Sequence, residues 1–217
     1  MGNPPRCYGA LHPRRVQQGG ERVHMLCVGC ETLISRFERQ FQQLMFPSGT
    51  MASLPITYGS ALYKFACSVS WRVLTYLKLS TPDIYVKQTN ISNLLDPQIS
   101  FDKHEICEQA LARWADVLLI NNPIAADNHI VFLNGENVPH ERSDMSGFAI
   151  FHDELNLVVV SILGSILVLG FVKQGPGWNG TCIDPAGSVF PAHSQQVPAA
   201  FREWLRDLYS GLQEVAH

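Results

Sequence analysis

Two cysteines near the start of the chain have the spacing of a metal-binding pair. Cys27 and Cys30 are separated by two residues, one of them a glycine, and such a turn can direct both sulfurs toward one ion. A structural zinc site needs two more ligands, and candidates lie upstream. We therefore expect Zn²⁺ to be bound by Cys7, His12, Cys27 and Cys30, with His24 as the alternative to His12.

The same pair has two other interpretations. Exposed thiols at this spacing can form a redox-active dithiol, or they can be unrelated thiols at the start of a helix. A thioredoxin-type motif needs a preceding strand in a βαβ unit, and no such pattern precedes Cys27. The other three cysteines stand singly in apolar sequence and are expected to be buried as small hydrophobic residues: Cys67, Cys107 and Cys182.

Charge is distributed unevenly along the chain. A net charge of −3 over 217 residues excludes a protein that is basic throughout, and 46% hydrophobic residues exclude a disordered chain. The first forty residues nevertheless hold six arginines and three glutamates, so this segment is positive and the remainder is negative. Arg14, Arg15 and Arg22 are candidates for binding nucleic-acid phosphates or an acidic protein partner, and a solvated surface is the other interpretation.

Hydrophobic periodicity predicts helices first and strands second. Apolar residues at helical spacing predict three helices, over residues 31–45, 58–79 and 103–119. A capping box at Asp102 and Glu105 is expected to begin the third. Short extended segments follow at residues 129–133, 148–151, 181–183 and 189–190, and Pro198 starts a final amphipathic helix. This order predicts an α+β fold with a mostly antiparallel sheet and a C-terminal helix.

The most apolar segment, residues 155–172, approaches the length of a membrane span. Most of its residues are β-branched, and Gly164-Ser165 divides it into two runs of about seven residues. A buried β-hairpin is therefore favoured over a membrane helix. The N-terminus lacks the apolar stretch of a secretory signal, which together with the cysteine spacing indicates a reduced, cytoplasmic compartment.

The first forty residues resemble the zinc-bearing treble-clef segment of HNH (His-Me finger) endonucleases. The matching residues are Cys7, His12-Pro13 and the run Leu26-Cys27-Val28-Gly29-Cys30. A longer pattern is similar to a group of bacterial proteins with this N-terminal motif and a larger C-terminal region, and it includes Glu31, Ile34, Ser35, Glu38 and Ser70-Trp71-Arg72. The resemblance implies a treble-clef-like zinc segment over residues 1–47, an α+β body over residues 48–217, and an accessory role in antiviral defence or a mobile element.

The resemblance leaves two functions open. If His12 ligates zinc, the general base of an HNH nuclease is missing, and if His12 is that base, His24 must complete the zinc site. Glu31 stands where the family usually has Asn or His, and its carboxylate can hold Mg²⁺ or Mn²⁺ or simply favour the positive end of a helix. We expect a structural zinc site in a protein that recognises nucleic acid or a protein partner without being an enzyme. A metal-dependent HNH-type endonuclease (a phosphodiesterase) is the alternative.

Two further pairs can serve either chemistry or structure. Arg72 can bind an anion, but pairing with Glu38 across two helices is the favoured interpretation. His152 and Asp153, near a strand end, can act as a general base with an orienting acid, although no nucleophile lies nearby in the sequence.

Overall fold

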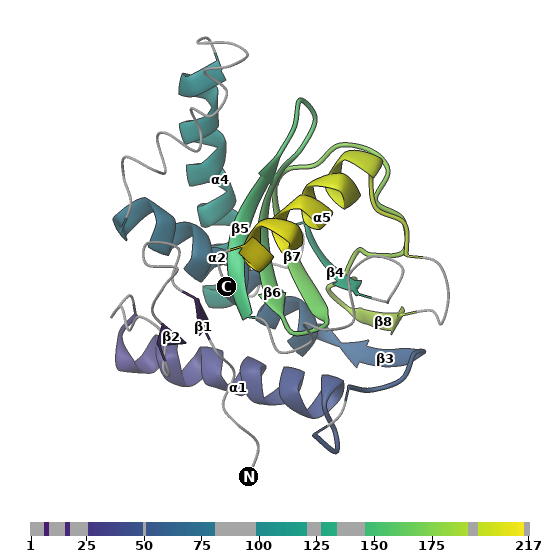
Figure 1. Ribbon diagram of the computed structural model, residues 1–217. Helices are drawn as coiled ribbons and strands as arrows, with labels where there is room; N and C mark the ends of the chain where they lie inside the picture. Colours follow the sequence, from purple (N-terminus) through teal and green to yellow (C-terminus); the bar gives the residue numbers. More distant parts are fainter. Residues whose placement is uncertain are drawn as a thin grey trace.

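Helices and strands make up most of the described chain. The computed structural model describes residues 7–8, 16–17, 26–49, 51–80, 99–120, 127–133, 146–190 and 195–214. Its helices are α1 (Val28–Met45), α2 (Ser60–Ser80), α4 (Ile99–Leu119) and α5 (Ala199–Glu214). Its strands are β1 (Cys7–Tyr8), β2 (Val16–Gln17), β3 (Ile56–Gly59), β4 (Asn128–Phe132), β5 (Ser146–His152), β6 (Leu157–Leu163), β7 (Ile166–Lys173) and β8 (Gly187–Phe190). This order confirms the predicted α+β class and the C-terminal helix (Figure 1).

The larger of two sheets is antiparallel at its centre. Its strand order is β2-β1-β5-β6-β7-β4, and β5, β6, β7 and β4 form three successive antiparallel pairs. Beyond β5, Cys7 of β1 pairs in parallel with Ser146. The smaller sheet joins β3 to β8, with Ile56 opposite Phe190, so it connects segments that are far apart in the sequence.

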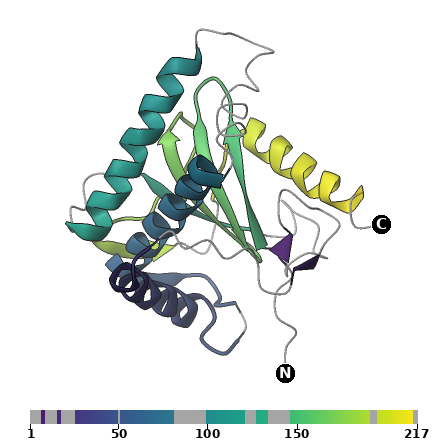
Figure 2. The same ribbon diagram turned by 90° about the vertical axis from the view of Figure 1, so that its left-hand side faces the viewer.

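Helices cover both faces of the central sheet. Ile130, Val159 and Val168 on one face pack in a core with residues of α2 and α4, whereas Val158 and Leu169 on the other face pack against α5. Figure 2 shows the three layers edge-on, with α2 and α4 on one side of the sheet and α5 on the other. Strands buried on both faces are apolar at nearly every position. This explains why the segment that forms β6 and β7 has the length and hydrophobicity of a membrane span.

The apolar segment forms the predicted hairpin. β6 and β7 pair from Leu157 opposite Lys173 to Leu163 opposite Ile166, with a two-residue turn between them. Gly164 in this turn has a φ of 64°, a left-handed conformation that glycine adopts without steric cost. Of the helices in the described ranges, none combines the length and hydrophobicity needed to cross a membrane.

Two of the predicted helix starts are wrong. Tyr58 lies in β3 rather than in a helix, because it pairs with Ser188 of β8. The helix predicted from residue 103 already begins at Ile99, so Asp102 lies inside α4 and is not its N-cap. Strand pairing across a long sequence separation explains the first error, since local periodicity carries no signal of the partner strand.

The first helix is fixed to the second by its inward face. The apolar stripe predicted over residues 31–45 is confirmed, and Phe41 stacks on Phe65 of α2 with ring centroids 3.9 Å apart. Beside this stack, Arg72 Nη1 lies 2.7 Å from Glu38 Oε1, which confirms the predicted pair between two helices. α1 is therefore a rigid support for whatever its exposed side and first turn bind.

A buried polar cluster joins both helices of one layer to the sheet. Asn128, the first residue of β4, is fully buried, and its Oδ1 accepts from Trp114 Nε1 of α4 at 3.0 Å. Its Nδ2 donates to Ser70 Oγ of α2 at 2.9 Å and to the Leu169 carbonyl of β7 at 3.3 Å. Because both polar atoms of the amide have partners, the cluster satisfies the requirement that a buried amide be hydrogen-bonded.

Candidate metal centre at the start of α1

The cysteine pair occupies the exposed first turn of α1. Cys27 is the N-cap residue, and the backbone N–H of Cys30 donates to its Sγ at 3.4 Å. The two Sγ atoms are 3.3 Å apart, with Cys27 exposed and Cys30 partly buried. Tetrahedral zinc with bonds of about 2.3 Å places two sulfurs about 3.8 Å apart. A movement of about half an ångström would therefore let both sulfurs bind one ion.

The two thiols differ in acidity. The backbone N–H and the thiol of Cys30, followed by the N–H of Gly29, lower the pKa of the Cys27 thiol by hydrogen bonding to its sulfur. The hydrogen bond between the two thiols raises the pKa of the Cys30 thiol, and desolvation and the negative charges of Cys27 and Glu31 add to this. The thiolate therefore forms first at Cys27. Thiolates rather than thiols bind metal. Cys27 is therefore the sulfur of the pair that reaches its metal-binding form first.

The remaining proposed ligands lie at the edge of, or outside, the described chain. Cys7 is in β1, and His12 and His24 fall outside the described residues, as do Arg14, Arg15 and Arg22. Within the part of the chain that the structure describes, no three side chains of His, Cys, Asp or Glu gather as a metal site. The described part therefore contributes the two sulfurs of Cys27 and Cys30, and the other two ligands stay a prediction.

Glu31 follows the cysteine pair directly. It is exposed in the first turn of α1, and its backbone N–H donates to the Cys27 carbonyl at 3.0 Å as part of the helix start. An acid at this position favours the positive end of the helix. Its carboxylate is also free to take part in an oxygen site, because the described residues offer it no ion pair.

Asp153, directly after β5, shapes a turn. Asp153 Oδ1 accepts from the backbone N–H groups of Leu155 and Asn156, at 2.8 and 2.7 Å. Both carboxylate oxygens also accept from Asn156 Nδ2 at 3.0 Å. These bonds hold the connection into β6, so the structure gives Asp153 a role in shaping a turn.

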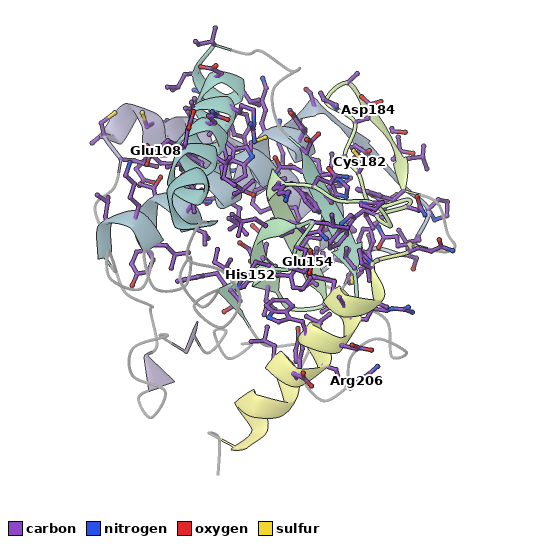
Figure 3. The ribbon with its side chains drawn as sticks, turned by 90° about the horizontal axis from the view of Figure 1, so that it is seen from above. Glu108, His152, Glu154, Cys182, Asp184 and Arg206 are labelled. Atoms are coloured by element: carbon purple, nitrogen blue, oxygen red, sulfur yellow. The ribbon has the colours of Figure 1, made fainter. Side chains whose placement is uncertain are left out.

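The three single cysteines differ in burial. Cys67 and Cys107 are buried, as predicted, whereas Cys182 is exposed, so its predicted burial is wrong. Cys182 lies next to Asp184 before β8 (Figure 3), where partial desolvation and the carboxylates of Asp127 and Asp184 raise its thiol pKa. A thiol in these surroundings is a weak nucleophile, because its thiolate is disfavoured.

The sequence gives no indication that one histidine, His129, is buried. His129 is 1% exposed in β4, and its Nδ1 lies 2.7 Å from Thr181 Oγ1. Its ring packs 4.5 Å from the ring of Phe171, and its Nε2 has no hydrogen-bond partner among the described residues. Burial lowers its pKa from 6.5 to about 4, with a smaller opposing effect from Gln174. Neutral His129 thus fastens the segment around Thr181 to the edge of the sheet.

Acid is expected to destabilise the fold through His129. Its pKa is about 4 when folded and 6.5 when exposed, so as the pH falls the unfolded chain takes up the proton first. The titration of His129 therefore leaves the free energy of unfolding unchanged above about pH 6.5. Below this, the free energy of unfolding falls progressively down to about pH 4, by up to about 3 kcal/mol. Urea denaturation at several pH values measures the unfolding free energy.

His129→Leu supplies the comparison, since it removes the titrating ring and keeps the site apolar. We expect its pH profile between 6.5 and 4 to be flatter than that of the wild type. Equal slopes for His129→Leu and the wild type would contradict the assignment.

Comparisons of the chain with protein-family models, with curated proteins and with solved structures found no match.

Proposed function

We propose that this protein binds structural zinc through Cys27, Cys30 and two of Cys7, His12 and His24. The zinc would order the basic N-terminal segment in a treble-clef-like arrangement and present it to a nucleic acid or an acidic protein partner. The body of the protein, with α1 fixed on α2, would act as the support. The resemblance to bacterial HNH-type proteins supports an accessory role of this recognition in antiviral defence or in a mobile element, without a catalytic step.

The observation that carries the proposal is the geometry of the cysteine pair. Both sulfurs lie on one exposed turn, 3.3 Å apart, and hydrogen bonds from backbone N–H groups favour the thiolate of Cys27. The order of elements also supports it, since the antiparallel strands β1 and β2 precede α1 and Cys7 lies in β1. Zinc would further explain how a segment with few apolar residues acquires a fixed structure.

Purified protein is expected to contain about one zinc ion per chain, and Cys27→Ala/Cys30→Ala is expected to lose it. Metal content measured by mass spectrometry checks this result. Because zinc binding contributes to folding, a chelator should lower the Tm of the wild type and leave the Tm of the double variant unchanged.

Cys182→Ala is the matched control, because it also removes an exposed thiol but lies in the segment before β8 and not in α1. It should retain the zinc and the response to the chelator. Wild-type protein that is prepared without chelators and contains no zinc would contradict the proposal. A reversible loss of two thiols without any metal would favour the redox dithiol instead.

The alternative function is a metal-dependent endonuclease with His12 as the base and Glu31 as a ligand of Mg²⁺ or Mn²⁺. The exposed carboxylate of Glu31, adjacent to Cys30 and without an ion pair among the described residues, favours it. Incubation of the zinc-loaded protein with plasmid DNA and either cation tests it. Cleavage that disappears in both His12→Ala and Glu31→Gln would establish the nuclease in place of the recognition role.

A further inference from the structure

The exposed side of α1 has an unusual composition after its first turn. Every exposed residue beyond Glu31 is an arginine or a neutral polar residue: Thr32, Ser35, Arg36, Arg39, Gln40, Gln42 and Gln43. This set, here named the outer face of α1, includes no carboxylate and no apolar side chain. In Figures 1 and 2, α1 lies at the periphery of the ribbon, along α2.

The two arginines of the outer face are not neutralised by the described residues. Glu38, the nearest acid in the same helix, is bound to Arg72 of α2. No carboxylate in the described ranges forms an ion pair with Arg36 or Arg39. The salt bridge that fixes α1 to the body thus also occupies the acid nearest to these two charges, and the outer face keeps a net positive charge.

The residue types and the dimensions of this face match a row of phosphates. Arginine, serine, threonine and glutamine side chains are the ordinary donors to phosphate oxygens in nucleic-acid complexes. Arg36 and Arg39, three residues apart, lie on the same side of the helix. From Thr32 to Gln43 the helix rises by about 16 Å, which is roughly the rise of five phosphates of one strand along the axis of a duplex.

The same composition argues against a protein as the partner. The centres of interfaces between proteins are enriched in aromatic residues, methionine and arginine, and of these the outer face has only arginine. A polar surface rich in arginine is instead typical of contacts with a nucleic-acid backbone.

We propose that the outer face of α1 docks on the phosphate backbone of a nucleic acid, with Arg36 and Arg39 as its principal contacts. The proposal rests on the proposed recognition function and commits it to one class of partner. Because the contacts are to phosphates, binding depends on charge rather than on base sequence and weakens with salt.

The experiment measures the affinity of zinc-loaded protein for a fluorescent 20-base-pair DNA duplex and a matching RNA duplex, at several salt concentrations. Arg36→Ala/Arg39→Ala is expected to weaken binding by about tenfold and to reduce the slope of log K against log salt by about 2. Alanine preserves the helix, so circular dichroism and zinc content should stay those of the wild type.

Arg202→Ala/Arg206→Ala is the matched control, because it removes two exposed arginines from α5 (Arg206 is labelled in Figure 3) and changes the net charge equally. It should bind as the wild type does. The proposal is overturned if this control weakens binding as much as the α1 variant, or if the α1 variant binds normally. It is also overturned if polyglutamate binds the protein as tightly as the duplexes.

Zinc content measured on the same samples separates this proposal from the one it rests on. Zinc-loaded protein that binds neither duplex overturns the role of the outer face and leaves the metal site standing. Protein without zinc whose duplex binding still depends on Arg36 and Arg39 overturns the metal site and supports the outer face.

Discussion

Gly170→Ala is expected to destabilise the protein by about 3 kcal/mol or more, or to prevent folding. Gly170 lies in β7 opposite Asn128, and a Cβ at this position would meet Ser70 Oγ and Cβ of α2 and, at 2.7 Å, Trp114 Cζ2 of α4. None of these atoms is the free end of a flexible side chain. Ser70 is held by Asn128, and the Trp114 ring is fully buried. The helices or the sheet would have to move apart.

Gly147→Ala is the matched control, because it changes a glycine of the same sheet to alanine. A Cβ on Gly147 in β5 would meet no heavy atom within 4 Å. We expect its unfolding free energy in urea to stay within about 0.5 kcal/mol of the wild type. If Gly170→Ala were as stable as Gly147→Ala, the close approach of α2 and α4 to β7 would be wrong.

Asn128→Ala is expected to cost about 4 kcal/mol of stability. The substitution removes the acceptor of the Trp114 indole N–H and of the Cys67 thiol, and the donor to Ser70 and the Leu169 carbonyl. These groups are buried, so water cannot replace the amide without entering the core. Each buried polar group left without a partner costs about 1–3 kcal/mol, and the vacated volume adds to this.

A double-mutant cycle with Trp114→Phe tests the mechanism of that loss. Phenylalanine lacks the indole N–H, so Asn128→Ala should be less damaging in this background, with a coupling energy of about 1 kcal/mol or more. Asn179→Ala is the control, because its exposed side chain bonds Gln196 at 3.2 Å and should contribute little. Strict additivity of Asn128→Ala and Trp114→Phe would contradict the shared hydrogen bond.

Some features of the candidate site can be predicted from the sequence, and others cannot. The Cys-x-x-Cys spacing and the amphipathic helix after it predict two thiols on one turn, and the structure places Cys27 and Cys30 there. Their spacing cannot show that the two thiols differ in acidity, because this depends on the backbone N–H groups of Gly29 and Cys30. The pairing of Glu38 with Arg72, by contrast, is predicted from the sequence and confirmed by the structure.

The sequence by itself determined the elements whose signal is local. Apolar residues at a spacing of three and four set α1 and α5, and β-branched runs around Gly164-Ser165 set the hairpin. These patterns act within a few residues of the chain, so they can be read along it.

Only the tertiary structure decided what depends on distant segments. Tyr58 becomes a strand residue because β8 lies beside it, and Cys182 is exposed although the sequence predicted its burial. Asn128 and His129 are adjacent, yet one faces Trp114 and the other faces Thr181, on opposite sides of a strand that is covered on both faces. The side chains that meet a residue across the fold decide its burial, its hydrogen bonds and its acidity, and no local pattern specifies them.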